Sequence, residues 1–150
     1  MRQQRRDFLA LVSLMAAAGL LPPGAVRAEE WNKAAFSAKN MDDLLRILGA
    51  GAPRLSAEVV LMAPEIAENG AVVPVEIESK VPGTQSIAIL IEKNPNIFTA
   101  SFNIPSGTLP WLQTRVKMAE TCKVYVLVNA GGQFHYTTKE IKVTLGGCGG

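Results

Sequence analysis

The sequence has 150 residues, enough for one domain, and a formal net charge of +2 at pH 7. The first 28 positions hold four of the 15 Lys and Arg residues and one of the 13 Asp and Glu residues, so the remaining 122 residues have a net charge of −1. Without a basic patch or a run of charge, nucleic-acid binding has no electrostatic basis in this chain.

Residues 1–28 predict a cleaved export signal. A basic start is followed by an apolar stretch from Phe8 to Leu21, and Val26-Arg27-Ala28 supplies small residues at which a signal peptidase cuts. The apolar stretch is too short for a bilayer core, which needs roughly 20 residues. An ordinary secretory leader and a twin-arginine leader both place the mature chain outside the bacterial cytoplasm, and we expect the periplasm. The leader resembles the twin-arginine signature, with the matching residues Arg5, Arg6, Phe8 and Leu9.

Residues 31–49 predict a helix. Asn40 suits its N-cap, and Gly49 suits its end. The apolar spacing i, i+3, i+4, i+7 predicts one buried face on this helix, formed by Met41, Leu44, Leu45 and Leu48.

From residue 55 the pattern changes to short β-strands separated by turn residues. Residues 86–92 are almost wholly apolar and suit a central strand, and Gly131-Gly132 fits a tight hairpin turn. Seven or eight short strands between residues 55 and 145 predict a mainly β, antiparallel, immunoglobulin-like β-sandwich. The strand order does not follow from the sequence. The expected strands are residues 55–62, 71–79, 86–92, 98–104, 111–118, 122–129, 133–138 and 140–145.

The chain closes on Gly146-Gly147-Cys148-Gly149-Gly150. Glycine loses more conformational entropy on ordering than any other residue, so this segment predicts a flexible arm. At roughly 3.5 Å per extended residue, the arm would carry Cys148 some 10 Å beyond Leu145. A thin arm suits a carrier that presents a bound group to several enzymes, whereas catalysis needs groups held in fixed geometry. We therefore expect a signal peptide (1–28), a helix plus β-sandwich carrier domain (29–145) and a cysteine arm (146–150).

Cys148 is the residue predicted to carry the chemistry. Thiolates attack sulfur readily, so sulfur species are its natural cargo, and activation would have to come from partner proteins because no basic residue lies near it in sequence. A structural disulfide with Cys122 is an alternative, since exported proteins usually pair their cysteines. Cys122 falls on the apolar face of its expected strand, which favours an inert buried thiol.

Two other classes of function are weighed against a carrier. The first is an immunoglobulin-like binding module whose C-terminal cysteine forms a structural disulfide. The second is a thiol oxidoreductase, which the absence of a C-x-x-C pair disfavours. The single histidine, His135, is expected on the polar side of its strand, and one histidine with two separated cysteines predicts no metal site and no cofactor.

Several segments resemble the SoxY family, the sulfur-carrier subunit of the bacterial sulfur-oxidising (Sox) system. The resemblance covers essentially the whole mature chain, and its most specific part joins a glycine-rich composition, a cysteine and the chain end. The matching segments are Val143-Thr144-Leu145-Gly146-Gly147-Cys148-Gly149-Gly150, Ile66-Ala67-Glu68-Asn69-Gly70-Ala71-Val72-Val73-Pro74-Val75, Ile91-Glu92-Lys93-Asn94-Pro95 and Thr114-Arg115-Val116-Lys117-Met118.

The resemblance implies that a reduced sulfur compound such as thiosulfate is attached covalently to Cys148, and that the chain itself is not an enzyme. It further implies a heterodimer with SoxZ, another β-sandwich. The haem c protein SoxXA would load the thiol, the metal-dependent hydrolase SoxB would release sulfate, and the sulfur dehydrogenase SoxCD, where present, would oxidise the remaining sulfur. One departure is Cys122, which if exposed would compete for cargo or lock the arm in a disulfide.

Overall fold

The computed structural model describes residues 32–144. The expected signal peptide and cysteine arm lie outside this range. No helix within it is long and apolar enough to cross a membrane. The two helices are α2 (Lys33–Ser37) and α3 (Met41–Ile47). The strands are β1 (Arg54–Leu55), β2 (Val59–Met62), β3 (Ile66–Ala67), β4 (Val73–Ser79), β5 (Thr84–Ile91), β6 (Phe98–Asn103), β7 (Trp111–Val116), β8 (Cys122–Ala130) and β9 (Gln133–Val143).

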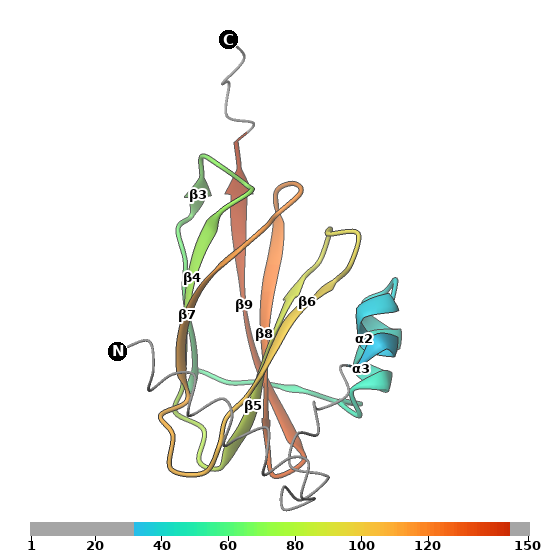
Figure 1. Ribbon diagram of the computed structural model, residues 1–150, viewed down its shortest axis with the longest axis vertical. Helices are drawn as coiled ribbons and strands as arrows, with labels where there is room; N and C mark the ends of the chain where they lie inside the picture. The colour runs from blue at the N-terminus through green and yellow to red at the C-terminus, as the bar shows by residue number, and fades with distance from the viewer. Residues whose placement is uncertain (1–31, 145–150) are drawn as a thin grey trace, which may run out of the picture. The chain divides into compact units, whose positions relative to one another are not determined.

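The strands form two sheets that face each other, with the helices on the outside of the larger one (Figure 1). The larger sheet has the order β1-β9-β8-β5-β6, and β3 also pairs with β9; the smaller sheet has the order β2-β4-β7. The mainly β, immunoglobulin-like sandwich is therefore confirmed. The pairing is antiparallel except for the two shortest strands, β1 and β3, which run parallel to β9.

Two apolar cores hold these layers together. The first lies between the sheets, where alternate residues of β4, Val73, Val75 and Ile77, are almost fully buried. The second lies between the helices and the outer face of the larger sheet and includes Leu44 and Leu90. Burying apolar surface contributes about 25 cal/mol per Å², so both faces of β5 and β8 help to stabilise the fold.

The central position expected for the apolar run at residues 86–92 is confirmed. β5 lies between β8 and β6. Ile87, Ile89 and Ile91 enter the inter-sheet core, and Ala88 and Leu90 enter the core under the helices. A strand covered on both faces has no polar side, which is why its sequence does not alternate.

The expected single helix is wrong in its extent, because two short helices replace it. The side chain of Asn32 caps α2 and that of Asn40 caps α3, each by accepting a hydrogen bond from a backbone N–H in the first turn. Ala38, between the helices, has extended backbone angles. The predicted cap at Asn40 is confirmed, and Gly49 follows α3 with a φ of 72°, a left-handed conformation that glycine adopts without steric cost.

The last two expected strands are one strand, β9. Gly131 and Gly132, both with positive φ, form the predicted tight turn that joins β8 to β9. β9 then pairs with β8 along its length, from Gln133 opposite Ala130 to Ile141 opposite Cys122. The long hairpin carries the chain directly to one end of the sandwich, where the described residues stop at Thr144 (Figure 1).

Candidate functional site at the root of the cysteine arm

The residues on which sequence analysis places the function are outside the described range. They are Cys148 with its glycine neighbours Gly146, Gly147, Gly149 and Gly150, and the export signature at Arg5, Arg6, Phe8 and Leu9. The structure defines the root of the arm instead, since it describes the chain as far as Thr144, four residues before Cys148. This root consists of the end of β9 and the segments that contact it.

β3 holds one edge of the arm's root. Its two residues pair in parallel with β9, Ile66 opposite Lys142 and Ala67 opposite Val143. The backbone N–H of Lys142 donates to the carbonyl of Glu65 at 2.9 Å, and that of Thr144 donates to the carbonyl of Ala67 at 3.1 Å. The last described residue is thus tied to the sandwich by its backbone.

Gly70 allows the chain after β3 to pass close to the root. A Cβ atom at Gly70 would lie 2.5 Å from the carbonyl oxygen of Met118 and 2.8 Å from Cγ1 of Val143. The N–H of Met118 also donates to the carbonyl of Gly70 at 2.7 Å. Only a residue without a side chain fits between these two neighbours.

Thr121 holds the root from the β8 side. The N–H of Val143 donates to Oγ1 of Thr121 at 2.9 Å, and Ile141 is paired with the adjacent Cys122. β3, the turn at residues 68–72 and the loop at residues 117–121 therefore contact the end of β9 from both sides, and we call these three segments the arm collar. Figure 1 shows β3, the end of β9 and the β7–β8 connection at the same end of the sandwich.

Asn94 connects the collar to the turn between β5 and β6. Its amide nitrogen donates to the carbonyl of Lys117 at 2.7 Å, and its Oδ1 accepts from the N–H of Ala119 at 3.0 Å. Lys93 and Glu120 add an exposed ion pair, 3.6 Å from nitrogen to oxygen, between the same two segments. The turn at residues 94–96 thus braces the collar through the side chain of Asn94.

We expect Asn94→Ala to lower the free energy of unfolding by about 1 kcal/mol. Each amide bond to the loop contributes on that order, and the freed backbone groups of Lys117 and Ala119 can be hydrated at the surface. Denaturant unfolding measures the change. Asn96→Ala, an exposed asparagine in the same turn, is the matched control and should stay within about 0.5 kcal/mol of wild type. Equal losses in both variants would contradict the bracing role.

Cys122 lies in the inter-sheet core beside the collar. It is a free thiol, 4% exposed, and it packs in the inter-sheet core cluster with Ile141. Burial raises the pKa of the Cys122 thiol above its ordinary value of 9.0. The thiolate is the reactive form, so burial and the raised pKa both make this thiol unreactive. The predicted burial of Cys122 is confirmed, and its low reactivity stays a prediction.

We expect a thiol reagent to modify one cysteine quickly in the native protein and two after denaturation. Cys122 is shielded and protonated in the folded state, so Cys148 should be the fast site at pH 7–8. Peptide mapping after a timed reaction identifies the modified residue. Rapid modification of Cys122 without unfolding would overturn this assignment.

Most of the chain matches a known protein family. The family described as sulfur oxidation protein SoxY matches residues 45–148, so the match includes the collar and ends at Cys148. The chain belongs to the SoxY family.

One solved structure agrees with the family match. The sulfur carrier protein SoxY from Chlorobium limicola f thiosulfatophilum is 36% identical, with a TM-score of 0.63, and the similarity covers 69% of this chain and 96% of that one. An engineered protein (15% identity, TM-score 0.40, 59% and 21% covered) and the human F-spondin reeler domain (11%, 0.38, 62% and 93%) are more distant. A search of curated proteins finds no match.

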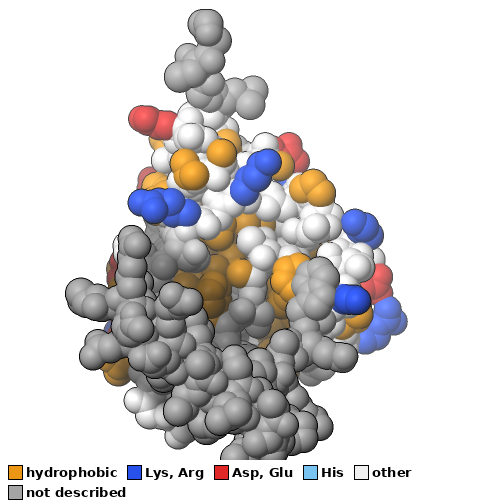
Figure 2. Space-filling model, viewed as in Figure 1, with side chains coloured by type: hydrophobic (Ala, Val, Ile, Leu, Met, Phe, Trp, Pro, Cys, Tyr) orange, Lys and Arg blue, Asp and Glu red, His pale blue; other side chains and the backbone are white. Residues whose placement is uncertain are grey.

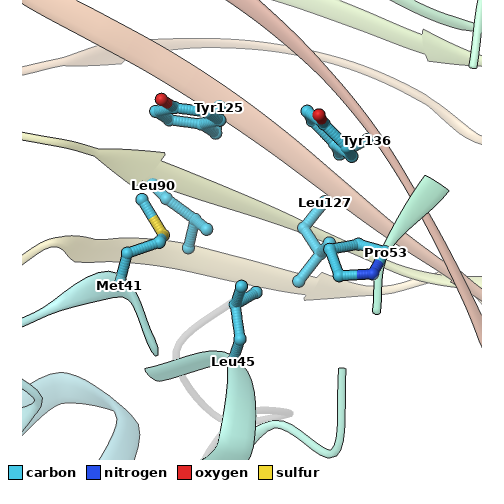
Figure 3. Close-up of a pocket in the computed structure, with 7 residues that line it drawn as sticks. All are labelled: Met41, Leu45, Pro53, Leu90, Tyr125, Leu127 and Tyr136. Atoms are coloured by element: carbon cyan, nitrogen blue, oxygen red, sulfur yellow. The ribbon is translucent and has the colours of Figure 1, made fainter. Parts of the chain in front are cut away.

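This SoxY-family chain also has an apolar hollow of about 210 Å³ between α3 and the outer face of the larger sheet (Figure 3). In Figure 3, Met41 and Leu45 of α3 face the rings of Tyr125 and Tyr136 across it. Tyr136 and Val143 are seven residues apart on β9, a separation of about 23 Å along a strand. The hollow contains no charged side chain, and we assign it no part in the chemistry of the arm.

The expectation for His135 is wrong. The pairing of β8 and β9 places His135 opposite Val128, a core residue, and its side chain is half-buried. Phe134 and Tyr136, on the other side of β9, pack against the core under the helices. Within residues 32–144, no three His, Cys, Asp or Glu side chains gather in a way that could hold a metal ion.

Proposed function

We propose that this SoxY-family protein is a periplasmic covalent carrier of sulfur intermediates, with Cys148 as the attachment site. Membership of the family places the chain in sulfur oxidation, and its solved relative is a sulfur carrier protein. The observation that supports Cys148 is the contrast between the two cysteines. The family match extends to Cys148, whereas Cys122 is buried and its thiol is held protonated.

The proposed loading reaction is an oxidative conjugation. The thiol of Cys148 and thiosulfate join through a new bond between Sγ and the outer sulfur, giving Cys–S–S–SO₃⁻, one proton and two electrons. The electrons pass to the haem c of SoxXA, which is the oxidant. Because the carrier only supplies the thiol, the collar needs no catalytic group of its own.

The proposed unloading reaction is a hydrolysis by SoxB. Water attacks the terminal sulfonate sulfur, the S–S bond to it breaks, and sulfate leaves while the sulfur electron pair stays on Cys148 as a persulfide. Two protons are released. SoxCD, where present, would then oxidise the persulfide sulfur, and a further hydrolysis would return the free thiol.

The glycines of the arm and the partner subunit complete the proposal. Residues 146, 147, 149 and 150 have no side chains, so Cys148 could be inserted into a narrow channel of each enzyme in turn. SoxZ is proposed as the heterodimer partner. The twin-arginine signature fits this assembly, since that route carries proteins already folded or joined to a partner.

The test is intact-mass spectrometry of the protein purified from the periplasm with its partner, before and after reduction. We expect reducible additions on Cys148 that match sulfur, sulfonate or thiosulfonate. The opposite outcome is a disulfide between Cys122 and Cys148 in every molecule, seen as a uniform mass two hydrogens below that of the reduced chain. That result would contradict the carrier proposal and favour a structural disulfide. Covalent dimers linked through Cys148 and free of sulfur adducts would favour a binding module.

A further inference from the structure

The length of the arm limits which surface an enzyme can touch while it acts on the cargo. Four residues lead from Thr144 to Cys148, so even a fully extended arm moves the cysteine Cα only about 14 Å from the root. Given the proposed function, an enzyme that receives Cys148 in a channel must bring the mouth of that channel against the arm collar.

The collar presents two large apolar side chains to solvent at this place. Ile66 is 56% exposed on β3, directly opposite Lys142 of β9, and Val72 is 51% exposed two residues after Gly70. Ile66 alternates with the buried Ala67 on β3, and Val72 comes directly before the buried Val73 at the start of β4. Neither side chain is needed to fill the core, so both are available to a partner.

The backbone that carries these side chains is fixed. The N–H of Val72 donates to the carbonyl of Asn69 at 3.3 Å, and the side chain of Asn69 accepts from the N–H of Ala71 at 2.9 Å. Ile66 is held by the pairing of β3 with β9. Isoleucine and valine also have few rotamers, so binding to them would cost little conformational entropy.

The charges around the two side chains have the arrangement of an interface rim. Glu65 and Glu68 flank β3, Lys142 lies on β9, and all three are exposed. Figure 2 shows separate hydrophobic side chains among charged ones over this end of the molecule. An apolar centre with a polar, mixed-charge rim is typical of protein–protein contacts that form and dissociate.

We propose that Ile66 and Val72 are the docking surface for the enzymes that act on the group bound to Cys148. The partner would have a narrow channel with an uncharged, apolar mouth, and a reacting centre that the cargo can reach while the Cα of Cys148 lies no more than about 14 Å from the root. Isolated exposed apolar residues are ordinary on protein surfaces. These two differ because the arm's length brings every such enzyme into contact with them.

The experiment uses the complete protein, purified with SoxZ, in wild-type, I66E/V72E and V72T forms. L109E is the matched control, because Leu109 is 81% exposed in the β6–β7 connection, outside the collar. Each protein is first loaded with tetrathionate, whose central S–S bond breaks as the Cys148 thiolate forms Cys–S–S–SO₃⁻ and thiosulfate leaves. Sulfate release by SoxB is then measured as a function of carrier concentration.

We expect I66E/V72E to be loaded at the wild-type rate and to lose at least tenfold in kcat/KM with SoxB, chiefly through KM. V72T, which keeps the shape of valine, should lose a smaller factor, and L109E should change by less than twofold. Wild-type kcat/KM for I66E/V72E would overturn the docking surface and leave the carrier function intact. Loss of SoxZ from I66E/V72E on gel filtration would also overturn it, because the patch would then face the partner subunit. Failure of wild-type Cys148 to take any cargo would instead refute the proposed function.

Discussion

Cys148→Ser is expected to abolish thiosulfate-dependent sulfate formation by the reconstituted Sox enzymes, with a loss of at least about 1,000-fold. A serine hydroxyl is neither ionised at neutral pH nor able to form a bond to sulfur that the enzymes can cleave. The fold should not change, because Cys148 lies beyond the last residue that β3 and Thr121 hold. Sulfate yield and the intact mass of the carrier are the two measurements.

Cys122→Ala is the matched control for this prediction. It removes the other sulfur atom from the chain but leaves Cys148, so sulfate formation should stay within about twofold of wild type. Removal of a buried sulfur leaves a small cavity, and the free energy of unfolding should fall by about 1 kcal/mol. Full activity in Cys148→Ser, or loss of activity in Cys122→Ala, would show that the cargo is carried elsewhere.

Much of the fold was predictable because each predicted element rests on local pattern. Val73, Val75 and Ile77 alternate with polar residues and become the inner face of β4, and Gly131-Gly132 makes the predicted hairpin turn. Cys122 was predicted to be buried from its place in the same kind of alternation. These features follow from the period of a strand, which neighbouring residues in sequence are enough to define.

The features that the sequence did not reveal depend on contacts between distant segments. β3 has two residues, too few for any period, and it exists because it pairs with β9 about 75 positions later. His135 was misplaced because β9 is covered on both faces, by the smaller sheet and by the helices, so aromatic residues do not mark a single inner side. The bracing role of Asn94 similarly depends on the loop at residues 117–121.

The candidate site, like the fold, was predictable from the sequence only in part. Composition alone pointed to Cys148, because a cysteine among four glycines has no structural explanation of its own. The collar was not predicted, although Ile66–Val75 was among the segments that resembled the family. A glycine in a loop is usually interpreted as a turn, and only the distances from Gly70 to Met118 and Val143 show that it is a packing position.

Gly70→Ala is expected to loosen the root of the arm and to lower the free energy of unfolding by about 1–3 kcal/mol. The added methyl group would overlap the carbonyl oxygen of Met118 and the side chain of Val143, so the turn at residues 68–72 or the end of β9 must move. Met118 offers only backbone there, which cannot rotate away. For a domain of this size the loss corresponds to several degrees in Tm.

Hydrogen exchange can show where this strain is relieved. The N–H groups of Lys142 and Thr144 donate to carbonyls next to and within β3, so both should exchange faster in Gly70→Ala than in wild type. Gly51→Ala is the matched control, because nothing lies within 4 Å of its added Cβ. That variant should keep wild-type exchange and stability.

If the collar positions the arm, Gly70→Ala will also lose kcat/KM with SoxB while its Cys148 still takes cargo from tetrathionate. Normal exchange at Lys142 and Thr144 in Gly70→Ala would show that β9 does not depend on the collar, and the arm's root would then be held by the β8–β9 hairpin alone.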